Sequence, residues 1–316
     1  MQMRALGHSG LQTAPLVFGG NVFGWTADKA RSFELLDAFV DAGFNAIDTA
    51  DAYSRWVPGH DGGESETIIG EWLKTRGRRD DVLILTKVGS DMGQGHNDLS
   101  PAWIERAVDD SLRRLNADVI DLYQAHFPDP NTPQDATLAA FDRLVQAGKV
   151  RAIGVSNHSA DATAEALAIS AREGLAGYQT VQPHYNLYSR DTFEGPLQDL
   201  AVEKGLGAIT YFSLESGFLS GKYASLDDLK GSARAVALRD KFNERGVRIL
   251  ATLRAVAERN EATPAQVALA WLMTRPGVAA PIVSATTLEQ LADTLKAAEL
   301  TLSDTDLAEL TTASEA

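Results

Sequence analysis

Short apolar runs alternate with longer amphipathic segments along nearly the whole chain. The short runs are bounded by turn residues, which is typical of buried strands, and the longer segments carry apolar residues at helical spacing. The predicted strands are 16–18, 44–48, 82–87, 120–125, 150–155, 178–181, 206–210 and 278–283. The predicted helices are 28–42, 65–75, 101–115, 160–173, 193–204, 247–259, 264–273, 288–297 and 303–310, with one more ending near 148. Ser65 and Ser100 are expected to cap two of these helices.

This alternation continues without a linker and predicts one domain over residues 1–316. A length of 316 residues suits an α/β barrel, a fold that often reaches this size as a single domain. Residues 3–13 are expected to form a β-hairpin before the first strand, with its turn at 7–10. The predicted fold class is α/β: a single (β/α)8 TIM barrel with an N-terminal β-hairpin and C-terminal helices.

Reactive polar residues follow three successive predicted strands at equal intervals along the chain. Asp48 ends the second strand, Lys87 ends the third, and His126 follows the fourth. Tyr53 comes shortly after Asp48. Any one of these residues alone would usually be a turn or surface residue. Their recurrence at the C-terminal ends of successive strands instead predicts a barrel active site, because barrel enzymes build their sites there.

Three motifs around these residues resemble the catalytic signatures of the aldo-keto reductases. They are Asp48-Thr49-Ala50 with Tyr53, Leu85-Thr86-Lys87-Val88, and Asp121-Leu122-Tyr123-Gln124-Ala125-His126. The resemblance extends over about residues 6–294 and favours the branch that includes the potassium-channel β-subunits and many bacterial reductases. It implies a (β/α)8 barrel that reduces aldehydes and ketones to alcohols with NADPH, in a reversible reaction.

Composition and charge limit the other functions that the chain could have. The net charge of −14 disfavours nucleic acid and anionic membrane surfaces as partners. The absence of cysteine excludes disulfides and thiolate catalysis. The N-terminus has no apolar segment typical of a signal peptide, and no apolar run is long enough to span a membrane. We therefore expect a cytoplasmic protein.

The four polar residues form a chemically sensible set for carbonyl reduction. A carbonyl oxygen that gains charge needs a proton donor, and the Tyr53 hydroxyl can supply that proton. Lys87 is expected to lower the pKa of Tyr53, and Asp48 to keep Lys87 charged. His126 can hydrogen-bond the same carbonyl and orient the substrate. The family resemblance implies the same roles.

The sequence lacks the G-x-G-x-x-G pattern of a Rossmann site, and 217–222 departs from a Walker loop in its glycine spacing. The resemblance implies a different nicotinamide site. Its carboxamide partners would be Ser156, Asn157 and Gln182, and Tyr211 would stack on the ring. Gly20 and Asn21 are assigned to the cofactor site after the first strand. Ser213, Leu214, Gly217 and Lys222 fit the pyrophosphate loop, although Phe212-Ser213 stands where the family usually has Ser-Pro.

Residues after the seventh and eighth strands bear on the choice between NADP(H) and NAD(H). The resemblance implies a 2′-phosphate site made from a Lys and an Arg in the strand-seven loop and from Ser, Thr and Gln after strand eight. The matching residues are Lys222, Arg234, Thr286 and Gln290, with Asp293 as the adenine-contacting acid, and Ser284 is assigned to the cofactor site as well. Thr294 replaces the usual Asn. NADP(H) is therefore favoured, with NAD(H) as the alternative.

The expected substrate is a small carbonyl or sugar-like molecule in an open site. Aromatic residues and His126 are expected to wall the pocket: Trp25, Tyr53, Trp56 and Phe127. The physiological substrate and the oligomeric state stay open. One alternative is a non-catalytic NADP-binding regulatory subunit of the same fold. Another is a metal-dependent hydrolase using His126, His158, His184, Asp48 and Asp51, which the cationic Lys87 disfavours; His158 and His184 are expected to line the cofactor region or cap loops.

Overall fold

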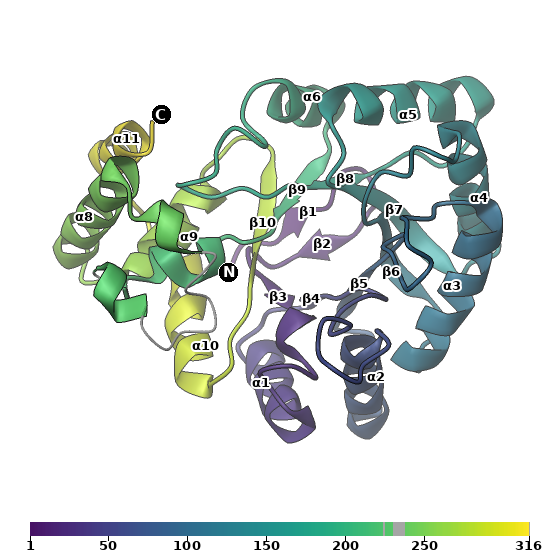
Figure 1. Ribbon diagram of the computed structural model, residues 1–316, viewed down its shortest axis with the longest axis horizontal. Helices are drawn as coiled ribbons and strands as arrows, with labels where there is room; N and C mark the ends of the chain where they lie inside the picture. The colour runs from purple at the N-terminus through teal and green to yellow at the C-terminus, as the bar shows by residue number, and fades with distance from the viewer. Residues whose placement is uncertain (224, 230–237, 316) are drawn as a thin grey trace.

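The computed structural model describes residues 1–223, 225–229 and 238–315 (Figure 1). Its barrel strands are β3 (Val17–Gly19), β4 (Ala46–Asp48), β5 (Leu83–Val88), β6 (Ile120–Ala125), β7 (Val150–Ser156), β8 (Thr180–Gln182), β9 (Gly207–Thr210) and β10 (Val278–Val283). Within the described residues, these eight parallel strands close into a barrel in the order β10-β3-β4-β5-β6-β7-β8-β9. The predicted (β/α)8 TIM-barrel fold is confirmed.

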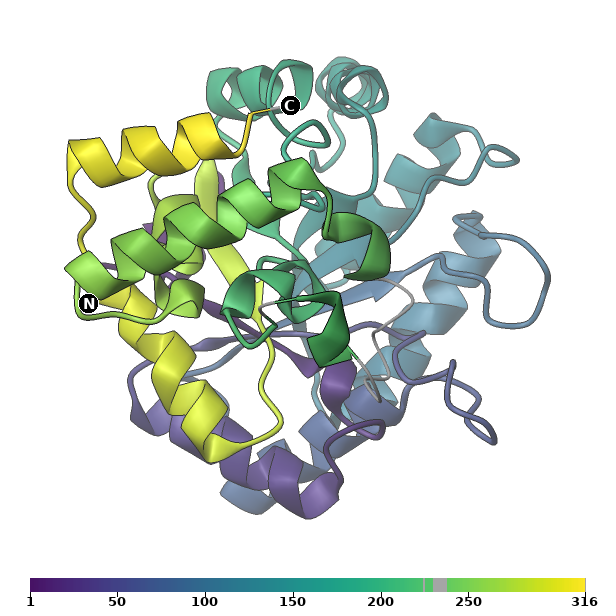
Figure 2. The ribbon, with the colours of Figure 1, turned by 60° about the vertical axis from the view of Figure 1, so that its left-hand side comes forward.

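Helices follow the strands and surround the barrel (Figures 1 and 2). The α-helices of the described residues are α1 (Lys29–Asp41), α2 (Glu64–Arg76), α3 (Pro101–Leu115), α4 (Gln134–Gln146), α5 (Ala160–Glu173), α6 (Pro196–Lys204), α8 (Glu244–Arg259), α9 (Pro264–Met273), α10 (Leu288–Leu295) and α11 (Asp304–Ala313). Figure 2 shows α8 and α11 side by side at the C-terminal end of the chain. The predicted C-terminal helices are thus present.

Local sequence signals set most helix starts. Ser100 caps α3 by accepting a hydrogen bond from Trp103 N, and Pro101 occupies the first turn, as expected. The predicted cap at Ser65 is wrong, because α2 already begins at Glu64 and its N-cap is Gly63 with φ 87°. A left-handed φ of this size favours glycine over residues that carry a side chain.

Ser65 has a structural role other than capping. It points inward from the first turn of α2, where its hydroxyl donates to Gly20 O at 2.8 Å and accepts from Thr49 Oγ1 at 2.8 Å. It therefore ties α2 to the ends of β3 and β4. Helix α6 begins at Pro196, later than predicted, because Gly195 has φ 86° and ψ −130°, outside the helical region.

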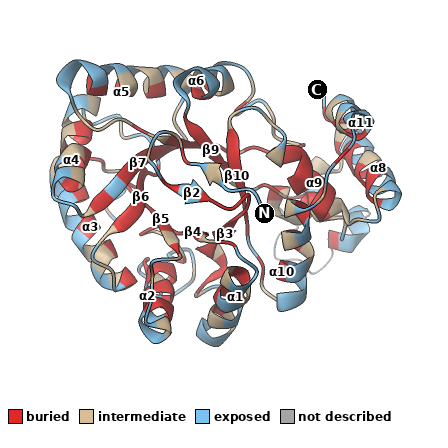
Figure 3. Cartoon of the chain, turned by 180° about the vertical axis from the view of Figure 1, so that it is seen from behind, coloured by how far each residue is buried: buried red, intermediate tan, exposed pale blue. Residues whose placement is uncertain are grey.

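The N-terminal hairpin closes the end of the barrel where the strands begin (Figure 3). It pairs β1 (Arg4–Ala5) with β2 (Gln12–Thr13), as predicted. Gly7 lies in its turn with φ 61°, and a Cβ there would lie 2.1 Å from Gln179 O, just before β8. Only glycine allows this close approach. The opposite rim, at the strand C-termini, is left for the polar residues.

Burial follows two concentric layers around the strands, which are mostly buried in Figure 3. Side chains inside the barrel form a small apolar cluster that includes Leu6, Val17, Leu85, Leu122 and Ile209. Larger clusters fill the space between the strands and the helices. No helix in the described part of the chain is both long and apolar enough to cross a membrane.

Candidate active site

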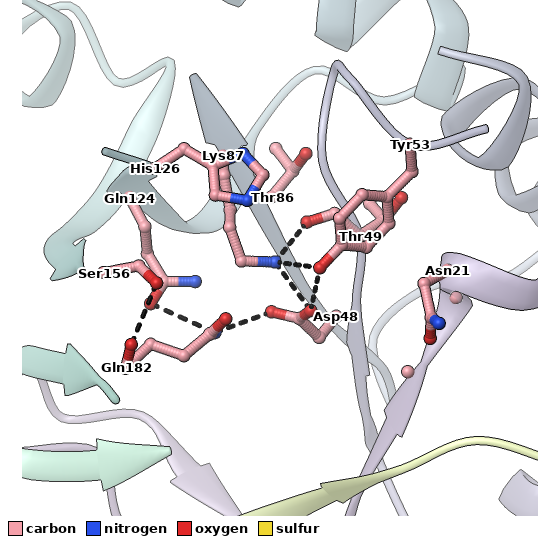
Figure 4. Close-up of polar contacts among 12 residues, drawn as sticks. Asn21, Asp48, Thr49, Tyr53, Thr86, Lys87, Gln124, His126, Ser156 and Gln182 are labelled. Atoms are coloured by element: carbon pink, nitrogen blue, oxygen red, sulfur yellow. Dashed lines mark hydrogen bonds and ion pairs between the residues drawn. The ribbon is translucent and has the colours of Figure 1, made fainter. Parts of the chain in front are cut away.

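The C-terminal rim of the barrel brings Asp48, Lys87 and His126 together. Asp48 is the last residue of β4, Lys87 lies near the end of β5, and His126 directly follows β6. Parallel pairing aligns these ends, since Asp48 is opposite Leu85 and Lys87 is opposite Gln124. All three predicted residues are buried, and Figure 4 shows their side chains in one polar group.

Lys87 is the centre of a compact hydrogen-bonded group (Figure 4). Its Nζ lies 2.6 Å from Asp48 Oδ2, 2.8 Å from the Thr49 carbonyl oxygen and 2.9 Å from Tyr53 Oη. Tyr53 Oη also lies 3.3 Å from Asp48 Oδ2. Three acceptors therefore use the three N–H donors of the ammonium group, which fixes its position.

Burial shifts the protonation of this group. It raises the pKa of Tyr53 well above its ordinary value, and the Asp48 carboxylate adds to the rise. Burial also lowers the pKa of Lys87, while Asp48 opposes that change. The pKa of Tyr53 is therefore raised, opposite to the expected lowering, because burial and Asp48 set its direction. Tyr53 keeps its proton at neutral pH.

His126 is buried beside Tyr53, with ring centroids 5.9 Å apart. Its Nδ1 lies 3.0 Å from Ser90 Oγ, and its backbone oxygen accepts a 2.9 Å hydrogen bond from Asn157 Nδ2. Burial, with Lys87 adding to it, lowers the pKa of His126 well below its ordinary value. The ring is therefore neutral at neutral pH, with one nitrogen as donor and the other as acceptor.

Amide side chains from neighbouring strands extend this network. Gln182 Nε2 donates to Asp48 Oδ1 at 2.9 Å and lies 3.5 Å from Gln124 Oε1 (Figure 4). Ser156 Oγ donates to the Gln182 carbonyl oxygen at 2.9 Å. Gln124 is fully buried, and its Nε2 has no hydrogen-bond partner in the structure. The floor of the site thus has an unused amide donor beside the predicted Ser156 and Gln182.

Tyr211, directly after β9, is held between two side chains. Its hydroxyl donates to Asn157 Oδ1 at 2.7 Å. His184 stacks on its ring, with centroids 5.4 Å apart and planes inclined by 23°. His184 therefore lies against Tyr211, the residue predicted to stack on the nicotinamide. His158 Nδ1 lies 2.8 Å from the Ser156 carbonyl oxygen. Among the described residues, no group of acidic or histidine side chains could hold a metal ion.

The segment after Tyr211 turns sharply. Ser213 Oγ donates to Thr210 O at 3.0 Å, which anchors the start of the turn to β9. The amide of Gly217 donates to Leu214 O at 2.9 Å, and Gly217 has φ 95°. Lys222 is exposed, with its Nζ 4.6 Å from the centroid of the Tyr223 ring. The predicted Arg234 lies outside the described residues.

The ends of β3 and β10 bring a second set of predicted residues together. Ser284 Oγ donates to Asn21 Oδ1 at 2.7 Å, and Asn21 follows Gly20 in the turn after β3. Gln290 Oε1 accepts 3.0 Å hydrogen bonds from the amide and the hydroxyl of Thr286. These side chains form a polar strip at the start of α10.

Asp293 has a different environment from this strip. Its carboxylate accepts from Thr263 Oγ1 at 3.0 Å and from Gln266 Nε2 at 2.7 Å. Both partners belong to the capping box that begins α9. Asp293 therefore joins α10 to α9 in this structure, and an adenine contact would share a carboxylate that already has two donors.

Exposed aromatic residues lie next to Tyr53 and His126. Trp56 meets the Tyr53 ring edge-on at 6.1 Å and the Trp25 ring at 5.7 Å. Phe127 stacks on His126 at 4.7 Å. Trp25, Trp56 and Phe127 are exposed, although large apolar side chains are normally buried. Trp56 therefore lies beside Tyr53 and Phe127 beside His126.

Three residues of the site were not singled out from the sequence. Ser90 contacts the ring of His126, and Gln124 lies under the site. Glu215 is buried and accepts hydrogen bonds from four side chains. Gln124 was the one visible signal, as a polar residue near the end of the predicted strand β6. Ser90 and Glu215 lie in loops whose path the periodicity does not define.

Comparison with known proteins gives consistent matches over the chain. The family model described as Aldo/keto reductase family matches residues 15–315. The "Uncharacterized oxidoreductase YrpG" of Bacillus subtilis is 35% identical over 309 residues, which cover 96% of this chain and 92% of that protein. "Protein tas" of Escherichia coli is 32% identical, with 98% and 96% covered. A "Probable voltage-gated potassium channel subunit beta" of Oryza sativa is 34% identical, with 95% and 92% covered.

Proposed function

The chain belongs to the aldo/keto reductase family, and we propose that it reversibly reduces small aldehydes and ketones to alcohols with NADP(H). Members of this family generally bind a nicotinamide cofactor. One observation carries the proposal. Lys87 Nζ lies within hydrogen-bond distance of both Asp48 and Tyr53 in a buried position at the barrel mouth.

The side chains at the rim suit a nicotinamide group. A carboxamide needs both donors and acceptors, and Ser156, Asn157 and Gln182 offer both at the ends of β7 and β8. The buried Gln124 Nε2 has no protein partner, so this floor can take another polar group. The Tyr211 ring provides a flat aromatic surface beside them. When bound, the cofactor supplies the hydride that reduces the carbonyl carbon.

Tyr53 is the proton donor in this proposal. Its raised pKa keeps the hydroxyl protonated until a carbonyl oxygen beside it becomes negatively charged. As the proton leaves, Lys87 donates to the phenolate oxygen and stabilises its charge. Asp48 keeps Lys87 charged in its buried position, and Gln182 donates to the second oxygen of Asp48. Each contact therefore supports the next.

His126 orients the substrate carbonyl. In the tautomer we assign to the neutral ring, Nδ1 accepts a hydrogen bond from the Ser90 hydroxyl and Nε2 carries the ring proton. That N–H can donate to the carbonyl oxygen that Tyr53 protonates. Trp25, Trp56 and Phe127 would contact the apolar part of the substrate.

The preference for NADP(H) rests on residues that could hold a phosphate. Lys222 is an exposed cation after β9, and Thr286 and Gln290 lie at the start of α10. Arg234 completes this set in the sequence. A phosphate held by Lys and Arg makes charge-assisted hydrogen bonds that NAD(H) lacks at this position.

The direct test is a panel of aldehydes, ketones and sugars assayed with NADPH and NADH separately. We expect consumption of NADPH with small carbonyl compounds, and slower consumption of NADH. Tight NADPH binding without turnover on any carbonyl compound would contradict the proposed activity. Equal rates with the two cofactors would contradict the proposed preference only.

A further inference from the structure

Glu215 is a buried carboxylate that contacts neither Tyr53 nor Lys87. It follows Leu214 in the turn after β9 and adopts φ 47°, a value uncommon for a residue other than glycine. Its side chain is almost fully buried. A buried carboxylate costs free energy unless it is hydrogen-bonded or paired with a cation.

Four donors converge on the Glu215 carboxylate. Oε2 accepts from Asn186 Nδ2 at 2.7 Å, Ser189 Oγ at 2.8 Å and His184 Nε2 at 3.0 Å. Oε1 lies 2.8 Å from Lys241 Nζ. Burial would raise the pKa of Glu215, but hydrogen bonds from His184, Lys241 and Asn186 outweigh it and lower the pKa to about 2. Glu215 is thus ionised and firmly held at neutral pH.

One of these donors leads to the proposed cofactor platform. A carboxylate only accepts hydrogen bonds, so His184 carries a proton on Nε2 and its ring orientation is fixed. The same ring stacks on Tyr211 with planes inclined by 23°. Tyr211 is fixed at its other end by the hydrogen bond to Asn157. One face of the Tyr211 ring is therefore covered by His184, which leaves the opposite face for a ligand.

Backbone contacts reinforce this coupling. His184 and Tyr211 form a β-bridge, and the Tyr211 amide donates to Pro183 O at 3.0 Å. Asn186, which Glu215 also binds, donates from Nδ2 to the Phe212 carbonyl oxygen at 2.9 Å. The carboxylate therefore joins the segment after β8 to the segment after β9 on both sides of Tyr211.

We propose that Glu215 is a positioning residue, which sets the plane of the Tyr211 ring through His184 and so aligns the nicotinamide for hydride transfer. This inference rests on the proposed function, because it gives Tyr211 the role of the stacking surface. Without the negative charge at residue 215, His184 loses its anchor and Tyr211 loses the support on its covered face. The nicotinamide end is shared by NADPH and NADH, so both cofactors should be affected equally.

The test compares Glu215→Gln, His184→Phe and the double variant. His184→Phe keeps an aromatic ring against Tyr211 but removes the link to Glu215. Dissociation constants for NADPH and NADH are measured by quenching of protein fluorescence. We expect each single variant to raise the dissociation constants of both cofactors about tenfold, an effect of the size common for coupled neighbouring residues. The double variant should be no weaker than either single variant, because the two residues act as one unit.

Asp306→Asn is the matched control. Asp306 is also a buried carboxylate with a pKa lowered to about 2, but it accepts from Ser303, Arg259 and Asn260 between α8 and α11. The Asp306→Asn variant should leave the dissociation constants of both cofactors unchanged. Weakening by Asp306→Asn to the same extent would overturn the proposal, because the loss would then reflect general destabilisation. Unchanged binding in Glu215→Gln, or full additivity in the double variant, would overturn it as well.

A second readout needs no cofactor. Hydrogen exchange of the Tyr211 amide in the free protein should be faster in Glu215→Gln than in the wild type, and unchanged in Asp306→Asn. Unaltered exchange in Glu215→Gln would overturn the positioning role. If the wild type binds neither cofactor, the proposed function fails, and this exchange still decides whether Glu215 holds Tyr211.

Discussion

At the scale of single residues, Lys87 connects the stability of the site to its chemistry. It is fully buried, and it satisfies Asp48, Thr49 O and Tyr53 at once. Removing one partner of a buried ion pair leaves an uncompensated charge, which is more costly than losing a surface pair. A change at Lys87 should therefore affect Tyr53, the proposed proton donor, and the Asp48 carboxylate together.

A double-mutant cycle tests whether Lys87 and Tyr53 act as one unit. We expect Lys87→Met to lower kcat about as much as Tyr53→Phe, and the double variant to be little worse than either. The kcat of all four proteins is measured with one aldehyde at saturating NADPH. Losses that multiply in the double variant would show that the two side chains act independently.

His126 provides a prediction about pH. Because burial lowers its pKa well below the ordinary value, the ring stays neutral from weakly acidic to alkaline pH. The profile of kcat/KM should therefore show no inflection near about 6.5, the ordinary histidine pKa. His126→Gln should lower the rate without changing the shape of the profile in this range. An inflection there that disappears in His126→Gln would contradict a neutral His126.

Single residues also mark where sequence reasoning worked and where it stopped. Asp48, Lys87 and His126 could be placed together because they end neighbouring parallel strands, whose C-termini must share one rim. The pKa direction of Tyr53 could not be predicted, because it depends on burial. Glu215 could not be recognised, because its four partners come from segments that approach only in the folded barrel.

At the scale of elements, the apolar periodicity located each barrel strand, because buried parallel strands are nearly continuous apolar runs. The starts of some helices could not be predicted from this periodicity, because the backbone conformation of a single residue decides them. The starts of α2 and α6 depend on Gly63 and Gly195, whose dihedral angles are not visible in the sequence pattern. The packing between helices could not be predicted from the sequence pattern either, as the contact between α2 and α3 illustrates.

Gly70 in α2 allows that contact. A Cβ at this position would lie 2.0 Å from Arg114 O on α3 and 2.6 Å from the Leu115 carbonyl carbon. A backbone carbonyl cannot move aside as a flexible side chain can. We expect Gly70→Ala to lower the free energy of unfolding by about 2 to 3 kcal/mol, despite the higher helix propensity of alanine.

Urea unfolding measures this loss, and Gly177→Ala is its control. A Cβ at Gly177 would meet nothing closer than 3.8 Å. That variant should stay within about 0.5 kcal/mol of the wild type. Equal stability of the two variants would show that α2 and α3 do not pack as closely as described.

At the scale of the whole molecule, the negative net charge opposes binding of the proposed anionic cofactor. A protein with a net charge of −14 repels an anion at long range, so binding must come from local cations. Lys222 is exposed after β9, and Arg234 follows it in the sequence, outside the described residues. The proposed preference for NADP(H) therefore depends on a few contacts to the phosphate.

Arg234→Ala tests that dependence. A charge-assisted contact to phosphate is worth about 1.5 to 3 kcal/mol, which corresponds to roughly ten- to a hundredfold in affinity. We expect the dissociation constant of NADPH to rise by that factor and that of NADH to stay nearly unchanged. Fluorescence titration of both cofactors gives the comparison. Equal weakening of the two would place the phosphate elsewhere.

The central claim is that Tyr53 donates the proton in carbonyl reduction by a nicotinamide cofactor. Its most direct test is the kcat of Tyr53→Phe with a small aldehyde and saturating NADPH, measured beside the wild type. The phenyl ring keeps the shape of the site and removes the donor that lies 2.9 Å from Lys87 Nζ. We predict a loss of at least about a hundredfold, the low end of general-acid contributions. A kcat close to that of the wild type would contradict the assignment of Tyr53.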